Sequence, residues 1–530
     1  MNTNLRPELA AHLRQRLQAF AEGFRHNMAL VGPRGSGKSF QLQQLVARPA
    51  DGLLLIYCPL YRESCRSFLQ RLASSILRAG LPATTAAAAD DELSALMAVA
   101  ATELPKTAAA IASIEGLLAR RLYGEAFSRT LDVIPVLVAE RGVPCALVLD
   151  EFLFLEELGL VHAFHELGKR VMTWPSTLFI LASSSMVRAR GILRERLQLL
   201  FGQFELITLE SLAPATASAW VTQELKGLRG VQGMMPFLIH WLGAYPWYLS
   251  VFVRRLKELA AIDRHRSLTE ALLLHATWDV LGEPDGPLHQ WCVGRLEQIS
   301  HLRHGRRAME LLIGVAGGAR TATELSRQTG RAGLTNALQL LVEHDLAQRN
   351  GTCWMIPDPV LRCWLAAIAA SERSGARGAA AAARERCHVY LRGLWLRWLQ
   401  AQQLSFTDQV AELFAKFSDD TVSLDSKTGR LPKFDHIARQ APATAGPDAY
   451  LVADGAGRRW CAAVQQGPMD ENAVAGFDAF CRSQTPKPSR KVLVAKSGMD
   501  ENARVVAKSA NMWVWDADDL TMLSSLLGGP

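Results

Sequence analysis

The stretch GPRGSGKS, at residues 32–39, limits most strictly what this chain can fold into. It has a glycine, four further residues and then glycine, lysine and serine, the spacing of a loop whose backbone N–H groups curve around phosphates. A loop of this kind follows a buried strand and opens a helix. Residues 27–32 (NMALVG) read as a short apolar strand, and residues 38–47 (KSFQLQQLVA) read as an amphipathic helix. The sequence therefore predicts a strand, a phosphate-binding loop and a helix, in that order.

The chemistry of this loop predicts a nucleotide site. Lys38 would reach the β- and γ-phosphates, and the hydroxyl of Ser39 would bind Mg²⁺. We therefore expect ATP and Mg²⁺ as the cofactors. The residues expected to line the nucleotide are Gly32, Pro33, Arg34, Gly35, Ser36, Gly37, Lys38, Ser39 and Phe40. The alternative, a glycine-rich turn that binds no nucleotide, does not explain the flanking strand and helix.

A second apolar run ends in two acidic residues. In PCALVLDEFLFL, residues 144–155, Asp150 and Glu151 close the run. Asp150 would hold Mg²⁺ through water, and Glu151 would polarise the water that attacks the γ-phosphate. The other interpretation is that both acids lie on the surface and cap the next helix. A carboxylate pair at the end of an apolar strand, downstream of a phosphate-binding loop, favours the catalytic role.

A third apolar run, STLFILASSS at residues 176–185, ends in small hydroxyl residues. A polar residue at that point would lie between the two carboxylates and the γ-phosphate, so Ser183 or Ser184 is a candidate sensor of the nucleotide. A plain serine-rich turn is the alternative. Strands that alternate with helices predict an α/β fold. Its parallel sheet would be covered by helices on both faces, with the nucleotide at the carboxyl ends of the strands.

Composition excludes several classes of protein. Hydrophobic residues make up 49% of the chain and charged residues 21%, which argues against disorder. A length of 530 residues is too great for one hydrophobic core and predicts three or four globular domains. No apolar run has the roughly 18 residues of a membrane span, and the first residues read as a polar helix with arginines. We therefore expect a cytoplasmic protein without a membrane partner. Nine scattered cysteines favour reduced thiols over zinc or disulfides, and a net charge of +7 permits nucleic acid without requiring it.

Taken in order, the motifs GPRGSGKS, LVLDEF, FILASSS, LLFGQFELITLESLAP and WLGAYPWYLSVFVRRL resemble those of the archaeal-type ATPases, a branch of the AAA+/STAND class. The resemblance covers about residues 25–370. In that family a Gly-x-x-Pro turn in a helical lid follows the core. The sequence GAYP at residues 243–246 matches it, so the resemblance places Tyr245 and Pro246 at the nucleotide. The family also has a winged helix that ends in an Asp-Pro segment before a tryptophan, as IPDPVLRCWL at residues 356–365 does.

One position departs from the family pattern. Relatives usually carry arginine where this chain has Gln203, and such an arginine can compensate charge on the transferred phosphate. Its absence argues against fast hydrolysis. Arg188, Arg190 and Arg194 lie nearby and could replace it, or they form a solvated basic helix face.

Residues 301–365 predict three helices followed by two short strands around Asn350 and Gly351, the order of a winged helix. The third helix would present side chains able to contact phosphates and base edges, namely Arg331, Thr335, Asn336 and Gln339. Double-stranded DNA is therefore a candidate partner. The alternative is packing against the lid or a protein partner, because this region has no dense stripe of lysine and arginine.

Residues 396–530 alternate strands and helices in an order that resembles the restriction-endonuclease-like fold, which follows the winged helix in relatives. Active members place an aspartate at one strand start and acid-x-lysine on the next strand, to hold Mg²⁺ and stabilise the attacking hydroxide. Asp448 matches the first part, but residues 463–465 read Ala-Val-Gln. We therefore expect a nuclease relative without catalytic activity. Asp435 is a rival acid, and Lys433 or Lys496 would have to replace the lysine in an active domain.

The motifs predict an N-terminal helix at residues 1–25, an ATPase domain at 26–210, a helical lid at 211–300, a winged helix at 301–370, a linker at 371–395 and the nuclease-like domain at 396–530. The leading hypothesis is an ATP-binding switch whose nucleotide state moves the lid and winged helix. This would change contact with DNA or a protein, with oligomers in the ATP state. The alternatives are a STAND-like signalling or defence scaffold that binds proteins only, and an ATP-dependent nuclease. The alanine-rich insertion at residues 82–112 is expected to be helical, and we assign it no chemistry.

Overall fold

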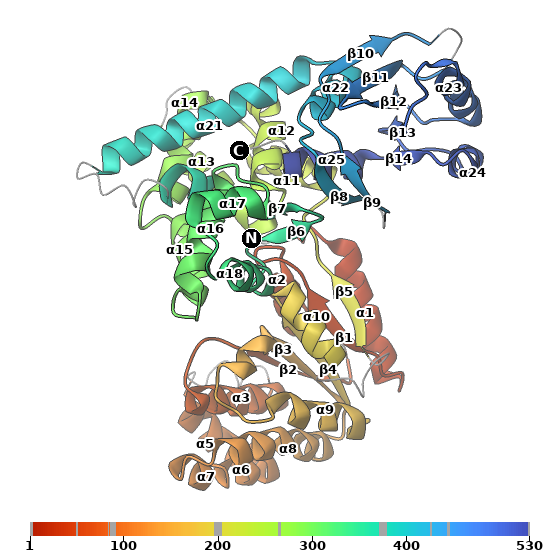
Figure 1. The fold of residues 1–530 in the computed structure, drawn as a ribbon. Coiled ribbons are helices and arrows are strands. Elements are labelled where there is room, and N and C mark those ends of the chain that lie inside the picture. Colours follow the sequence, from red (N-terminus) through yellow and green to blue (C-terminus); the bar gives the residue numbers. More distant parts are fainter. Residues whose placement is uncertain are drawn as a thin grey trace. The chain divides into compact units, whose positions relative to one another are not determined.

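The computed structural model describes residues 4–48, 51–82, 84, 92–195, 204–262, 267–369, 379–424, 427–442 and 446–527 (Figure 1). It confirms the predicted α/β class, because a five-stranded parallel sheet with helices on both faces forms the core of the first part of the chain. The chain separates into two compact units. The first consists of Met1–Lys226, Leu242–Val253 and Glu343–Asp345, and the second of Gly227–Trp241, Arg254–Val342 and Leu346–Pro530.

The sheet of the first unit has the strand order β2-β3-β4-β1-β5, and every neighbouring pair is parallel. Its strands are β1 (Asn27–Val31), β2 (Leu54–Pro59), β3 (Cys145–Asp150), β4 (Thr177–Ser183) and β5 (Phe204–Thr208). Successive side chains of a strand face opposite sides of a sheet, so Val148 packs in one apolar cluster and Leu149 in another. A sheet buried on both faces needs continuous apolar strands, which explains the unbroken apolar runs in the sequence.

Two sets of helices cover the two faces of this sheet. Leu13 of α1 and Leu42 of α2 pack on one face, while Phe68 of α3 and Leu167 of α9 pack on the other. The described helices are α1 (Pro7–Ala21), α2 (Lys38–Ala47), α3 (Cys65–Gly80), α5 (Leu93–Glu103), α6 (Pro105–Ala112), α7 (Glu115–Ala119), α8 (Tyr123–Arg141), the 3₁₀ helix η1 (Phe152–Glu156), α9 (Ala163–Thr173), α10 (Met186–Glu195) and α11 (Pro214–Glu224).

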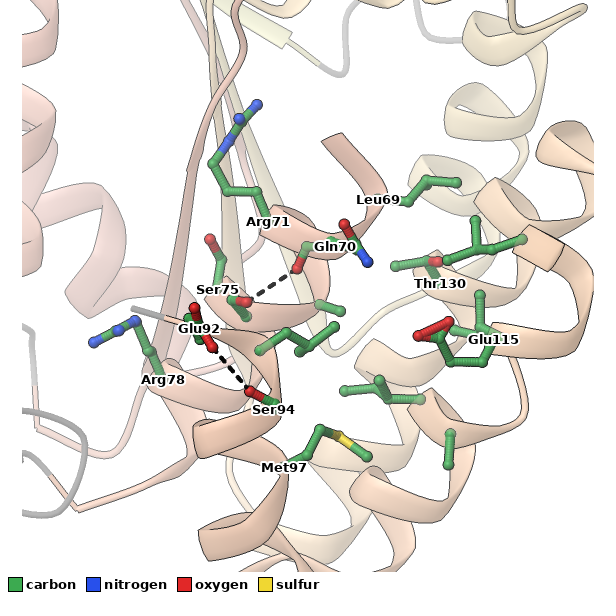
Figure 2. A pocket seen from close by; sticks show the side chains of 17 residues that line it. Leu69, Gln70, Arg71, Ser75, Arg78, Glu92, Ser94, Met97, Glu115 and Thr130 are labelled. Carbon is green, nitrogen blue, oxygen red and sulfur yellow. Dashed lines mark hydrogen bonds between the residues drawn. The ribbon is translucent and has the colours of Figure 1, made fainter. Parts of the chain in front are cut away.

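The alanine-rich insertion is helical within residues 92–112, as predicted, and its remaining residues lie largely outside the described parts of the chain. Helices α5 and α6 pack against α3 and α8 around a hollow of about 750 Å³ (Figure 2). Its walls are mainly apolar, and some of its polar side chains bond within their own helices. Ser74 Oγ donates to the carbonyl oxygen of Gln70 at 3.0 Å, and Thr130 Oγ1 donates to that of Ala126 at 2.8 Å. The insertion thus adds a second helical layer to the domain.

The chain between residues 227 and 403 is mostly helical. It contains three successive helices and a two-stranded hairpin, in the order predicted for residues 301–365: α16 (Gly305–Ala316), α17 (Ala322–Thr329), α18 (Leu334–Glu343), β6 (Gln348–Asn350) and β7 (Cys353–Met355). A capping box of Thr321 and Glu324 starts α17. The other described helical elements are α12 (Val231–Leu242), α13 (Pro246–Ile262), α14 (Glu270–Thr277), η3 (Trp278–Gly282), α15 (Pro287–Ser300), α19 (Pro359–Trp364), η4 (Leu365–Ala369) and α21 (Ala379–Gln403).

A second five-stranded sheet, with the order β10-β11-β12-β13-β14, forms the core of the C-terminal region. Its first three strands are antiparallel, and its last three are parallel. The elements are α22 (Phe406–Ala415), β8 (Asp420–Leu424), β9 (Lys427–Leu431), β10 (His436–Gln440), β11 (Ala449–Gly455), β12 (Arg458–Gln465), α23 (Glu471–Ser483), β13 (Arg490–Ala495), α24 (Glu501–Ser509), β14 (Trp513–Trp515) and α25 (Ala517–Leu527). Asp470 and Asp500 each lie in a copy of the sequence MDENA, and their side chains cap α23 and α24.

The hairpin β6–β7 is joined to strand β8 within the second unit. Thr352 donates its N–H to the carbonyl oxygen of Thr421 at 2.9 Å. The side chain of Asn350 accepts from the N–H of Ser423 at 2.6 Å and donates to its carbonyl oxygen at 3.0 Å. Gly351 lies at the tip with φ +62°, and a Cβ there would be 2.0 Å from the Thr421 oxygen. The hairpin tip is therefore covered by the C-terminal region.

All nine cysteines lie in the described residues, where each is buried and none forms a disulfide. Among the described residues, no helix is both long and apolar enough to span a bilayer.

Candidate nucleotide-binding site

The loop GPRGSGKS lies between β1 and α2, and its glycines are required by backbone conformation or by close packing. Gly35 and Gly37 have φ of +80° and +96°, values that residues with a Cβ rarely adopt. Gly32 is fixed by close packing, because a Cβ there would be 2.2 Å from the carbonyl oxygen of Leu209. The predicted strand, loop and helix are therefore present, and the loop has the tight backbone that a phosphate site needs.

Lys38 is the first residue of α2 and is only 4% exposed. Its Nζ donates to the carbonyl oxygens of Gly32 at 2.7 Å and Pro33 at 3.0 Å. Burial lowers the pKa of Lys38 to about 8, and the carboxylates of Glu151 and Asp150 oppose this effect. A cation that is buried away from water favours the binding of an anion beside it.

Asp150 ends strand β3 and is 3% exposed. One oxygen, Oδ2, accepts a hydrogen bond from the hydroxyl of Tyr57 at 3.0 Å, and the side chain of Ser39 is near enough to this carboxyl to lower its pKa. The other oxygen, Oδ1, is buried without a partner among the described residues. Burial raises the pKa of Asp150. A buried carboxylate oxygen with open acceptor capacity, beside a serine hydroxyl, fits a Mg²⁺ site.

Glu151 follows Asp150 and has a left-handed backbone, with φ 58° and ψ 45°. This conformation is unfavourable for a residue with a long side chain and is typical of functional positions. Its Oε2 accepts two hydrogen bonds from Ser184, one from the N–H and one from the hydroxyl, both at 3.0 Å. Ser184 Oγ in turn accepts from Nε of Arg34 at 3.1 Å. Arg34, Ser184 and Glu151 therefore form one hydrogen-bonded chain.

The two candidate sensor serines have different hydrogen-bond partners. Ser183 ends β4, is fully buried, and accepts a hydrogen bond from the N–H of Ser185 at 3.0 Å. Ser184 contacts Glu151 directly. Of the pair that the sequence left open, Ser184 is thus the residue at the carboxylate.

The turn at residues 243–246 lies against the loop within the first unit. Trp247, one residue after Pro246, donates its N–H to the carbonyl oxygen of Gly35 at 3.2 Å. The ring of Tyr245 is 5.4 Å from that of Tyr248. The backbone after this turn therefore contacts the loop, and the placement of Tyr245 and Pro246 at the nucleotide stays a prediction. Phe40 is half-buried in α2, and the hydroxyl of Ser36 is buried without a partner among the described residues.

Three residues at this site were missed by sequence reasoning. Arg6 donates from Nε to the carbonyl oxygen of Ser36 at 3.3 Å, and its guanidinium also contacts the carbonyl of Glu210. Tyr57 binds Asp150, and Trp247 binds the loop backbone. Arg6 and Tyr57 belong to no motif, and Trp247 lies in the segment WLGAYPWYLSVFVRRL, where only Tyr245 and Pro246 were singled out. All three reach the site through the packing of segments far apart in the sequence.

The three arginines of α10 have partners of their own. Arg188 pairs with Glu156 at 2.5 Å, Arg190 lies 3.4 Å from Thr208 Oγ1, and Arg194 lies 3.7 Å from Glu195 at an exposed position. Gln203, where relatives usually have arginine, lies outside the described residues.

The predicted DNA-contacting residues, Arg331, Thr335, Asn336 and Gln339, are all exposed. Thr335, Asn336 and Gln339 lie on α18, and Arg331 is in the turn before it. In a winged helix the hairpin often provides a second contact, but here its tip is hydrogen-bonded to Thr421 and Ser423. The exposed surface is therefore that of α18.

At the sheet of the C-terminal region, Asp448 and Gln465 lie at the same edge. Asp448 Oδ2 accepts from the N–H of Gln466 at 2.7 Å, and Oε1 of Gln465 is buried without a partner among the described residues. Lys496 follows β13 at this edge, where its N–H donates to the carbonyl oxygen of Gln465 at 3.1 Å. Its ammonium lies 5.4 Å from the centre of the Phe406 ring.

Two rival residues lie at the opposite end of strand β11. The N–H of Asp435 donates to the carbonyl oxygen of Asp454 at 2.8 Å, and Lys433 is next to Gly455. Asp454 is six positions along the chain from Asp448, which in a strand is a distance of about 20 Å. Lys433 and Asp435 therefore cannot complete a site with Asp448. No cluster of three or more potential metal-binding side chains occurs in the described parts of the chain.

No protein-family model matches this chain, and no curated protein matches it. Solved structures are similar at low identity. The Walker-type ATPase PABY2304 of Pyrococcus abyssi is 14% identical with a TM-score of 0.43, and the match covers 68% of this chain and 95% of that one. The ORC2 protein of Aeropyrum pernix, in ADPNP–ADP complexes, is 16% identical with a TM-score of 0.41, over 70% of this chain and 96% of that one. The RuvB Holliday junction branch migration motor of Thermotoga maritima is 13% identical with a TM-score of 0.33, over 70% and 95%.

Proposed function

We propose that this chain is an ATP- and Mg²⁺-binding ATPase of the AAA+/STAND class that works as a nucleotide-dependent switch. The observation that carries the proposal is the meeting of three groups at the carboxyl edge of one parallel sheet. They are the buried ammonium of Lys38, the unpartnered Oδ1 of Asp150 and the carboxylate of Glu151 held by Ser184. Parallel α/β sheets bind their ligands at this edge.

Each of these groups has a distinct role in the proposed reaction. The loop N–H groups at the start of α2, together with Lys38, bind the phosphates. Ser39 and Asp150 would hold Mg²⁺, which would neutralise charge on the phosphate oxygens. Glu151 accepts a proton from the attacking water, a step that requires a carboxylate freed from Ser184. In our proposal, the double hydrogen bond from Ser184 holds Glu151 in its resting position.

A contact beside the sensor serine supports a switch. Ser185 Oγ donates to Asp345 Oδ2 at 2.7 Å, and the N–H of Val187 donates to Asp345 Oδ1 at 3.3 Å. Asp345 belongs to the first unit and is two residues after the end of α18. A change at Ser184 thus has a short covalent and hydrogen-bonded route to the third helix of the predicted winged helix. We propose that ATP alters the contacts of α18 in this way.

The partner of the switch is double-stranded DNA in our proposal, because α18 exposes the polar side chains that suit base edges and phosphates. A protein-only scaffold is the second candidate, and the covered hairpin tip favours it because one DNA-contacting element is occupied. We place the protein in the cytoplasm, where its unpaired thiols would stay reduced, with oligomers in the ATP state.

Two substitutions test the ATPase. Lys38→Ala should weaken ATP binding by about a hundredfold or more, because it removes a buried charge-assisted contact with phosphate. Glu151→Gln should retain binding but lower the rate of hydrolysis by about 10²–10⁴-fold, since it removes the general base. Calorimetry with Mg²⁺-ATP gives the affinity, and phosphate release gives the rate.

The matched controls are Lys169→Ala and Glu103→Gln, at exposed positions on α9 and α5 of the same unit. Both controls should bind and hydrolyse ATP like the parent protein. Parental hydrolysis in both Lys38→Ala and Glu151→Gln would overturn the assignment.

A further inference from the structure

We propose that Arg34 is the cation that senses the terminal phosphate of ATP, and that the same guanidinium, through Ser184, holds Glu151 at rest when this phosphate is absent. This rests on the proposed ATPase function. It gives the role of the arginine missing at Gln203 to a residue of the phosphate-binding loop itself.

The connection between Arg34 and the catalytic carboxylate carries the proposal. Nε of Arg34 donates to Ser184 Oγ at 3.1 Å, and Ser184 donates from its hydroxyl and N–H to one oxygen of Glu151. Each arginine of α10 instead has a partner away from this carboxylate. Arg34 is thus joined both to the loop that would bind phosphate and to the residue that would activate water.

The charges of the loop explain why this arrangement would respond to a phosphate. Arg34 and Lys38 are two cations on one short loop, so their like charges repel each other. An additional negative group between them removes this repulsion. Guanidinium has five donors in a planar fork that suits phosphate oxygens better than a single serine hydroxyl does. Arg34 would therefore leave Ser184 for a terminal phosphate.

The consequence of that movement falls on Glu151. Oε2 of Glu151 accepts two hydrogen bonds from Ser184, so this oxygen is directed at Ser184 and not at a water. The Ser184 hydroxyl is oriented because Arg34 donates to its oxygen. Once Arg34 has left, this hydroxyl is free to rotate away from Glu151. Water activation is then coupled to a triphosphate and does not occur with a diphosphate.

The test compares the affinities for a triphosphate and a diphosphate. Calorimetry with Mg²⁺ and either ADP or β,γ-imido-ATP is carried out on the parent protein and on Arg34→Ala, Arg34→Lys and Ser184→Ala. Arg34→Ala should bind the triphosphate about 10–100-fold more weakly while ADP affinity changes less than about threefold, and its rate of hydrolysis should fall roughly 10²–10³-fold. Arg34→Lys should recover part of the triphosphate affinity and part of the rate of hydrolysis, because the positive charge remains while the planar set of guanidinium donors is lost. Ser184→Ala should keep the triphosphate preference but change the rate.

Arg188→Ala is the matched control, since Arg188 pairs with Glu156 and should leave the affinity ratio unchanged. An unchanged ratio of triphosphate to ADP affinity in Arg34→Ala would overturn the role of Arg34 while leaving the ATPase intact. Equal loss of both nucleotides in Arg34→Ala would show a purely structural role and would also overturn it. If the parent protein bound neither nucleotide, the ATPase assignment itself would fall, which is a separable result.

Discussion

Lys38 shows how one buried side chain sets the conditions for ligand binding. Its ammonium is surrounded by backbone carbonyls and carboxylates, which partly compensate for the loss of water. Burial still dominates, so the charged form is less favoured than in solvent. A phosphate next to Lys38 would favour the charged form again, so binding and protonation are coupled.

This coupling predicts a pH dependence of ATP affinity. Burial lowers the pKa of Lys38 from 10.5 to about 8, so the side chain is charged below this pH and neutral above it. Bound phosphate raises the pKa, so ATP affinity is fully present below pH 8 and falls as pH rises through it. The decrease should be about tenfold per pH unit. Calorimetry at pH 9 in two buffers of different ionisation enthalpy should show uptake of close to one proton.

Exposed Lys169 provides the control, because Lys169→Ala removes an amine outside the site and should keep the same pH profile. Constant affinity between pH 7 and pH 9.5, without proton uptake, would contradict the buried position of Lys38.

At the scale of elements, the hairpin β6–β7 gives a direct test of its contact with β8. Gly351→Ala would combine an unfavourable φ of +62° with a Cβ 2.0 Å from the Thr421 oxygen, so it should lower the free energy of unfolding by about 2–4 kcal/mol. Gly457→Ala is the matched control. Gly457 has φ +73° but open space around its Cβ position, so the cost should be about 1 kcal/mol. Urea denaturation measures both, and equal costs would show that the hairpin tip is not held by β8.

The elements also show what the sequence could predict. Continuous apolar runs predicted β1, β3 and β4, and the loop motif predicted the start of α2, because burial and phosphate geometry restrict local sequence. Strand β9 was not predicted, since KTGRL has little apolar pattern and is stabilised by pairing with β8. Helix α21 occupies most of the range predicted as a linker, and its alanine- and arginine-rich sequence favours a helix. The predicted linker residues 371–378 lie outside the described parts of the chain.

The candidate site was predictable to a similar extent. Lys38, Asp150 and Glu151 could be named because motif spacing carries their chemistry. The contact of Arg34 with Ser184 and the approach of Trp247 to Gly35 could not, because they depend on tertiary packing of segments about 150 and 212 residues apart.

At the scale of the whole molecule, we expect DNA to be bound without being cut. The neighbours of Asp448 on β12 are the backbone N–H of Gln466 and the amide residue Gln465. An active nuclease needs a second acid and a lysine there, so this edge lacks both a metal ligand and the cation that hydrolysis requires. Plasmid incubated with the protein, ATP and Mg²⁺ or Mn²⁺ should be shifted in a gel but remain supercoiled. Arg331→Ala with Asn336→Ala should abolish the shift, because both exposed side chains flank the start of α18.

Asp448→Ala is the control for cleavage and should behave like the parent protein. Nicking that disappears in both Asp448→Ala and Lys496→Ala would show that Lys496 serves as the catalytic lysine. Absence of any shift at low salt would favour the protein-only scaffold.

Because every cysteine is buried, the rate at which each thiol is modified reports local opening of the structure around it. Cys58, Cys65 and Cys145 belong to the first unit and the remaining six to the second. An alkylating reagent modifies a thiol only while the surrounding structure is transiently open. Brief alkylation followed by peptide mass analysis, with and without ATP, would therefore measure the opening of each unit separately. It would show in which of the two units ATP reduces this opening.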